Sequence, residues 1–109
     1  MDSTQLLKGV LDTAVLAVLE NEDGYGYDIV RRLRDAGFED IADATVYGTL
    51  RRLYIAGLLT SYVMPSDGGP HRKYYSVNEP GHQSLARHRV IWSEFTKNMS
   101  AVLETKGNK

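Results

Sequence analysis

Residues 58–77 contain two runs of β-forming residues on either side of a turn rich in glycine and proline. The first run reads LLTSYVM, the turn reads PSDGGP, and the second run contains RKYYSV. A strand, a Gly/Pro turn and a second strand predict a β-hairpin. This hairpin limits the choice of fold most strongly, because the segments before and after it have the periodicity of helices.

Three helices are predicted before the hairpin. Residues 6–19 place their apolar side chains on one helical face, and a second helix runs from about Gly26 to a C-terminal cap near Gly37. The third helix is predicted to begin with Asp43 as its N-cap and to end at Gly57. Its predicted buried stripe consists of Val46, Leu50 and Leu53.

A long helix is predicted after the hairpin. Asn78 is a candidate N-cap, and apolar residues then recur at the seven-residue spacing of a coiled-coil helix over roughly two to three repeats. Because such a stripe normally faces another helix, these residues are expected at a dimer interface. They are Leu85, Trp92, Phe95, Met99 and Val102.

The order of these elements predicts a fold that is mainly α with a small β-hairpin: a winged helix-turn-helix plus a long C-terminal dimerisation helix. We expect residues 1–78 to form the winged-helix DNA-binding domain. Residues 79–109 are expected to form the dimerisation helix and a frayed tail. In a winged helix the third helix enters the major groove of DNA, and the hairpin, or wing, lies beside it over the backbone or minor groove.

The formal net charge of the 109-residue chain is only −1, but its charges are unevenly distributed. Residues 20–43 contain eight acidic residues and three arginines, whereas residues 44–77 contain four basic residues and one acidic residue. A basic middle segment indicates a local surface that binds a polyanion such as DNA. The alternative is that these charges are merely solvated.

The predicted DNA-binding residues lie on the third helix and at the tip of the hairpin. Opposite its apolar stripe, the helix carries short or hydrogen-bonding residues and an arginine, which can contact base edges. These base-facing candidates are Thr45, Gly48, Thr49 and Arg52. Contacts with phosphate or the minor groove are expected from Tyr47, His71, Arg72 and Lys73. An alternative for Tyr47 and Arg51 is that they merely cover the second helix.

Two motifs, YGTLRRLYIAGL and GGPHRKYY, resemble those of the PadR family of bacterial transcriptional regulators. The resemblance covers residues 6–104 with the elements in the same order. The short, single C-terminal helix is similar to that of the compact, multidrug-binding LmrR-like branch. The resemblance implies a homodimer that binds a palindromic operator in double-stranded DNA, usually represses a neighbouring gene, and releases the DNA when a small molecule binds.

The same resemblance implies a ligand site at the dimer interface. Trp92 falls where LmrR-like members have a tryptophan that lines a pore between the subunits. By similarity, Leu6, Gly9 and Thr13 would face that pore. His88 and Arg89 precede Trp92, and their polar groups would favour an anionic or phenolic aromatic ligand. The periodicity by itself also allows Trp92 to be plain dimer core.

The histidines lack the spacing to serines or carboxylates that a nucleophilic or metal site requires. They are His71 in the wing, His82 at a helix start and His88 in the last helix. We therefore expect no enzymatic activity, metal or cofactor. No apolar run is long enough to cross a membrane, and the N-terminus does not resemble a signal peptide, so we expect a cytoplasmic protein.

A second function fits the same fold: a winged-helix dimer that binds a protein rather than DNA. The acidic residues 20–43 and the near-neutral net charge favour this alternative. The basic wing, and a third helix free of acids after Asp43, favour DNA.

Overall fold

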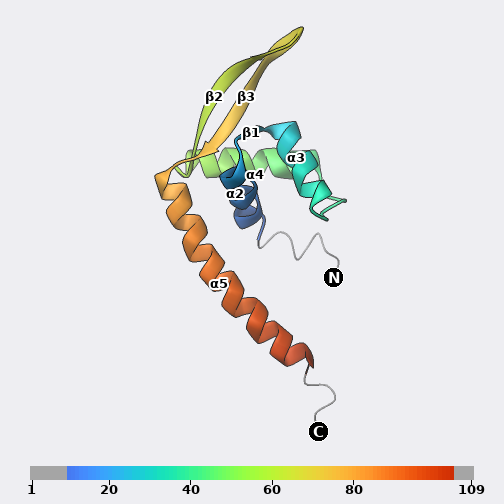
Figure 1. Ribbon diagram of the computed structural model, residues 1–109, viewed down its shortest axis with the longest axis vertical. Helices are drawn as coiled ribbons and strands as arrows, with labels where there is room; N and C mark the ends of the chain where they lie inside the picture. Colours follow the sequence, from blue (N-terminus) through green and yellow to red (C-terminus); the bar gives the residue numbers. More distant parts are fainter. Residues whose placement is uncertain (1–9, 105–109) are drawn as a thin grey trace.

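The computed structural model describes residues 10–104 and confirms the winged-helix fold with a long C-terminal helix (Figure 1). Within these residues, four helices accompany a three-stranded antiparallel sheet with the strand order β1-β3-β2. The elements in chain order are α2 (Leu11–Asn21), β1 (Gly24–Tyr25), α3 (Gly26–Asp35), α4 (Asp43–Ile55), β2 (Leu59–Ser66), β3 (Gly69–Val77) and α5 (Glu79–Leu103). Leu6, Gly9 and the predicted frayed tail lie outside the described residues.

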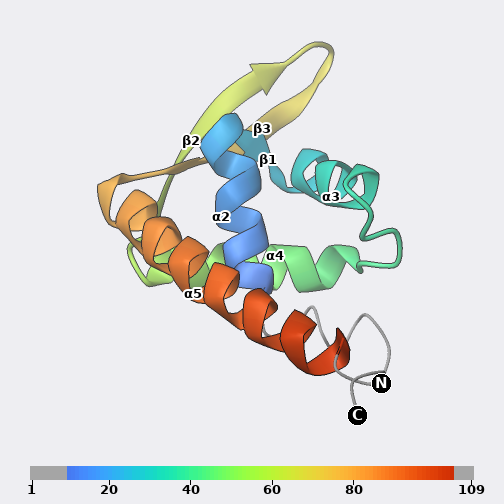
Figure 2. The same ribbon diagram turned by 60° about the horizontal axis from the view of Figure 1, so that its bottom comes forward.

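The hydrophobic core lies where α2, α3 and α4 pack together, with α5 crossing beside α2 (Figure 2). The predicted stripe of α4 is confirmed, because each of its three residues is almost fully buried. The buried apolar residues of the three helices are Leu11, Val15, Leu16, Leu19, Ile29, Val30, Leu33, Val46, Leu50 and Leu53. The sheet adds Leu59 and α5 adds Leu85.

The expectation that Leu85 lies at a dimer interface is wrong. Its side chain is fully buried in the core of its own protomer. The first turns of α5 pack against α2, so the start of the heptad stripe faces the winged helix instead of a second chain. The other predicted interface residues lie further along α5 and are exposed.

The predicted ends of the helices are largely confirmed. Gly37 (φ 125°) and Gly57 (φ 83°) adopt the left-handed conformation that glycine tolerates best, directly after α3 and α4. Asn78 caps α5, because its side-chain oxygen accepts a hydrogen bond from the amide of Gly81 at 2.9 Å. The N-cap of α4 is Ala42 instead of Asp43. The carboxylate of Asp43 instead forms an ion pair with Arg34 of α3 at 2.8 Å.

The wing projects from the helical body and is joined to it by β1 (Figure 1). Strands β2 and β3 pair from Leu59 opposite Val77 to Ser66 opposite Gly69. The two residues of β1 pair with the base of β3, placing Tyr25 opposite Tyr74. Sequence patterning does not predict β1, because a strand of two residues is too short to show an alternation.

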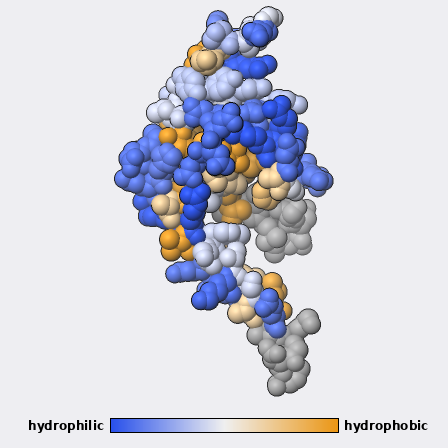
Figure 3. Space-filling model, viewed as in Figure 1, coloured by the Kyte–Doolittle hydropathy of each residue, from blue (hydrophilic) through white to orange (hydrophobic). Residues whose placement is uncertain are grey.

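The second half of α5 extends beyond the winged-helix body, where it exposes an apolar surface (Figures 1 and 3). Its exposed large apolar residues are Val90, Ile91, Trp92, Phe95, Met99, Val102 and Leu103. Despite this apolar surface, no helix within residues 10–104 is both long enough and apolar enough to cross a bilayer.

We expect Gly81→Ala to lower the free energy of unfolding by about 1–3 kcal/mol, as overpacking usually does. The added methyl group would collide with the carbonyl oxygen of Leu58 and lie 2.7 Å from Cγ1 of Val77. The matched control is Gly48→Ala, whose methyl group meets nothing within 4 Å and should stabilise α4 by about 0.5–1 kcal/mol. Urea denaturation at one protein concentration measures both changes, and an unchanged midpoint for Gly81→Ala would contradict this packing.

Candidate nucleic-acid interface

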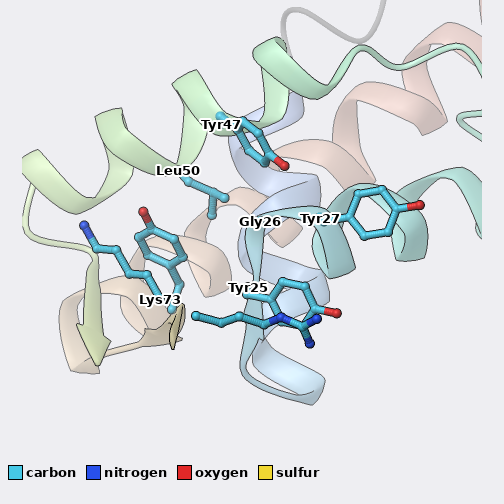
Figure 4. A pocket seen from close by; sticks show the side chains of 8 residues that line it. Tyr25, Gly26, Tyr27, Tyr47, Leu50 and Lys73 are labelled. Carbon is cyan, nitrogen blue, oxygen red and sulfur yellow. The ribbon is translucent and has the colours of Figure 1, made fainter. Parts of the chain in front are cut away.

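An open groove separates α4 from the wing. It consists of two adjoining hollows of about 570 and 530 Å³, which share Tyr47, Lys73 and Tyr75. Figure 4 shows the first hollow, with Tyr47 and Leu50 on α4, Lys73 on the wing, and Tyr25 at the start of α3. We call this feature the α4–wing groove. Its lining residues are Tyr25, Gly26, Tyr27, Tyr47, Gly48, Leu50, Arg51, Tyr54, Ile55, Arg72, Lys73 and Tyr75.

The α4–wing groove is basic and aromatic. Its charged lining residues are Arg51, Arg72 and Lys73, and none of the residues that line it is acidic. The guanidinium carbon of Arg72 lies 4.5 Å from the centre of the Tyr25 ring. The Lys73 ammonium lies 5.3 Å from the ring centre of Tyr54. These cation–π contacts hold both positive charges at the groove. Unlike an ion pair, a contact with a neutral ring does not neutralise the cation.

The basic residues of the wing lie in the body of β3 and not at the tip of the hairpin, where we expected them. Arg72 pairs with Met64 and Lys73 pairs with Val63 across the strands, whereas the turn lies between Ser66 and Gly69. His71, the nearest of the three to the turn, is also exposed. The positive charge of Arg72 and Lys73 therefore lines the groove beside α4, between the two elements that a winged helix presents to DNA.

One of the base-facing candidates on α4, Thr49, is corrected by the structure, and a second, Arg52, has a partner within the protomer. Thr49 is only 2 % exposed, and its hydroxyl donates a hydrogen bond to the carbonyl oxygen of Thr45 at 2.9 Å. Thr49 lies three and four residues from Val46 and Leu53, so it shares their buried side of the helix. Arg52 is exposed, but its guanidinium forms an ion pair with Asp12 of α2 instead of lining the groove.

The side of α4 that faces outward therefore differs from the side that we predicted would face the DNA bases. It carries Gly48, Arg51 and Ile55, all of which line the α4–wing groove. Thr45 is exposed but lies outside the lining of the groove. For Arg51, the lining position disfavours the alternative that it merely covers the second helix.

Tyr47 covers the start of the second helix and also lines the groove. It is 45 % exposed and lines both hollows of the groove, yet its ring also packs closely over Gly26 at the start of α3. A β-carbon at Gly26 would collide with this ring. Sequence reasoning missed Tyr25 and Tyr54 as groove residues, because their roles depend on cations that come from β3.

A cluster of tyrosines attaches the wing to the body of the protein. The Tyr62 hydroxyl donates a hydrogen bond to Asp23 at 2.5 Å, linking β2 to the loop before β1. This hydrogen bond is the main cause that raises the pKa of Tyr62, with smaller contributions from desolvation and the Asp23 charge. The Tyr62 ring also stacks on Tyr74, whose ring contacts Tyr25 edge-on. These contacts attach the wing to β1 and to the loop that precedes it.

The predicted ligand residues on α2 and α5 are only partly brought together. Thr13 Oγ1 and His88 Nδ1 lie 3.0 Å apart. Trp92 is 47 % exposed, and its ring stacks on that of Phe95 with 5.9 Å between the ring centres. Arg89 does not join Thr13 and His88, because it is bound to Glu20 near the other end of α2.

Glu20 attaches α5 to α2 through two partners. Its carboxylate lies 2.7 Å from the guanidinium of Arg89 and 3.3 Å from Nδ1 of His82. The hydrogen bond from Arg89 lowers the pKa of Glu20, against a smaller opposing effect of desolvation. The same hydrogen bond raises the pKa of Arg89. The charged groups of this pair are thus occupied within the protomer.

The sequence and the fold of this chain are similar to those of known proteins. The family model described as the transcriptional regulator PadR-like family matches residues 15–87. A PadR family regulator from Eggerthella lenta is 34% identical, with 95% of this chain and 90% of that chain covered and a TM-score of 0.84. A PadR-like regulator from Bacillus cereus is 29% identical, with 92% and 97% covered and a TM-score of 0.83.

The fold is also similar to that of Bacillus subtilis PadR, whose structure was solved in complex with operator DNA. The identity is 24%, the match covers 74% of this chain and 47% of that chain, and the TM-score is 0.68.

Proposed function

The chain belongs to the PadR-like family of transcriptional regulators, and from this premise we propose that it binds operator DNA as a homodimer and represses transcription. The α4–wing groove carries this proposal. Three cations and no acidic residue line this groove, which lies between a helix that can enter the major groove and a wing that can follow the backbone. Enzymatic activity is not part of the proposal, because members of this family are described as regulators of transcription.

Each groove residue has a role suited to its chemistry. We assign Arg72, Lys73 and the hydroxyl of Tyr47 to phosphate contacts, which position the protein without reading sequence. His71, nearer the tip of the wing, is assigned to the backbone or minor groove. Gly48 and Thr45 remain candidates for close approach to the bases, since both are exposed on α4. The operator complex of the structurally similar Bacillus subtilis PadR supports DNA as the partner.

Dimerisation through α5 follows from its exposed apolar residues. A helix that projects from the body with Trp92, Phe95 and Met99 on its surface would bury them against a second copy. We propose that this pairing places two copies of α4 about 34 Å apart, one turn of DNA, on a pseudo-palindromic operator. The N-terminal winged helix and the C-terminal helix then act as the DNA-binding and dimerisation domains.

We expect Arg72→Ala to weaken binding to all duplexes alike and to make the dependence on salt less steep. Each phosphate contact contributes about 0.9 to the slope of log binding constant against log salt, so losing one per protomer should remove about two units. Arg87→Ala is the matched control, because Arg87 is exposed on α5 and lies outside the groove lining. Fluorescence anisotropy with the duplex upstream of the gene measures both slopes.

The same titration separates DNA binding from the alternative, a winged-helix dimer that binds a protein partner. The acidic segment from residue 20 to residue 43 remains the observation that favours this alternative. If wild-type protein bound no duplex at low salt, or bound with an affinity independent of salt, the protein-partner function would be preferred.

We expect Phe95→Glu to convert the dimer to monomers at micromolar concentration, because a charge at a buried apolar contact loses its hydration without gaining a partner. Ser93→Glu adds the same charge on the opposite side of α5 and should leave the dimer intact. Sedimentation equilibrium gives the mass of each. A wild-type protein of monomer mass would contradict dimerisation, as would dimers that persist in Phe95→Glu.

A small aromatic ligand at the dimer interface is proposed as the signal that releases DNA, in the manner of the LmrR-like branch. The half-exposed Trp92 ring and the polar Thr13–His88 pair support a phenolic or anionic aromatic compound. We expect saturable quenching of Trp92 fluorescence by an aromatic acid or a phenol, accompanied by release of DNA if the ligand prefers a different spacing of the two α4 helices. No quenching by an aromatic acid, a phenol or a planar cation, with the dimer intact, would leave Trp92 as packing.

A further inference from the structure

Arg51 and Arg52, adjacent on α4, leave the helix in different directions. Arg51 lines the α4–wing groove, and the structure gives its side chain no ion pair or hydrogen bond with any residue from 10 to 104. Arg52 forms an ion pair with Asp12 of α2. Successive residues of a helix are separated by about 100°, so only one of the two can point along the outward side.

The side of α4 that bears Arg52 is linked to the protein interior. Thr49, one turn before Arg52, is buried, and its hydroxyl bonds to the backbone of Thr45. The negative charge of Asp12 beside the guanidinium would also repel DNA phosphates. Breaking this ion pair would leave Arg52 near α2, since the direction of its side chain is set by the buried stripe of α4.

The side that bears Arg51 is open. Ala44 and Gly48 precede it on the same side of the helix, and both are exposed. A β-carbon at Gly48 would meet no atom within 4 Å. Two small residues allow the backbone to approach the floor of the major groove, and a long side chain beyond them can then reach a base edge.

We propose that Arg51 is the residue that reads a guanine in each half-site, and that Arg52 is a positioning residue that holds α4 against α2 through Asp12. This inference rests on the proposed DNA-binding function. A guanidinium can donate two parallel hydrogen bonds to O6 and N7 of guanine, the commonest specific contact in the major groove. Among residues 10–104 its side chain has no ion-pair or hydrogen-bond partner, which leaves its donors available for that contact.

The test compares two neighbouring arginines that differ in surroundings and not in chemistry. Duplexes bound by wild type, Arg51→Ala and Arg52→Ala are selected from a randomised pool, and affinities are measured for the preferred site and its single base-pair variants. Arg51→Ala should lose a preference for one G·C pair per half-site, a discrimination of about 5- to 150-fold. Arg51→Lys should lose the same preference while it retains the salt dependence, because lysine keeps the charge but not the paired donors.

Arg52→Ala should keep the wild-type sequence profile and weaken all sites by a common factor. Asp12→Ala should have the same effect, and the double variant should add little to either single variant, since both remove one ion pair. A sequence profile unchanged in Arg51→Ala, or a G·C preference lost in Arg52→Ala, would overturn the assignment. Wild type that binds every duplex equally would overturn it while leaving DNA binding intact, whereas wild type that binds no duplex would overturn the proposed function itself.

Discussion

The burial of the α4 stripe against α2 and α3 is the constraint on which the other features depend. Val46, Leu50 and Leu53 are almost fully buried, and Thr49 joins them because its hydroxyl is satisfied by the helix backbone. Once this side is fixed, the rotation of α4 about its axis is fixed too. That rotation turns Gly48, Arg51 and Ile55 toward the wing and directs Arg52 toward α2.

The second element of the site is the wing, which is attached to the body by interactions between residues far apart in the chain. The short strand β1 pairs with the base of β3, and the Tyr62–Asp23 hydrogen bond ties β2 to the same loop. Arg72 and Lys73 rest on the rings of Tyr25 and Tyr54, which come from either side of the groove. A tyrosine ring can hold a cation without cancelling its charge, so the groove stays positive although the protein as a whole is nearly neutral.

In the proposed dimer, the attachment of α5 would fix the position of this interface relative to that of the second copy. Leu85 anchors the start of α5 in the core, Asn78 caps it, and Glu20 holds Arg89 from α2. These contacts fix the first part of α5 to the DNA-binding unit, while the apolar second part projects beyond it (Figure 1). A movement at the proposed subunit contact would therefore be passed to α4 through packed elements, as any ligand-controlled release of DNA would require.

The helices, the two strands of the wing and their order can be predicted from the sequence, whereas β1 cannot. Helical stripes, the cap at Asn78 and the glycines at 37 and 57 depend on neighbours within a few residues, so they are readable in the chain. The exposed flank of α4 depends on contacts between distant segments and cannot be predicted from the helix itself. Asp12, which pairs with Arg52, is 40 residues away. Strand β1, at residues 24–25, pairs with residues 74–75 of β3, which are still further away along the chain. Leu85 likewise fits the heptad of α5 but is buried by α2. Periodicity places a residue on one side of a helix, whereas the partner of that side is set by packing between distant segments.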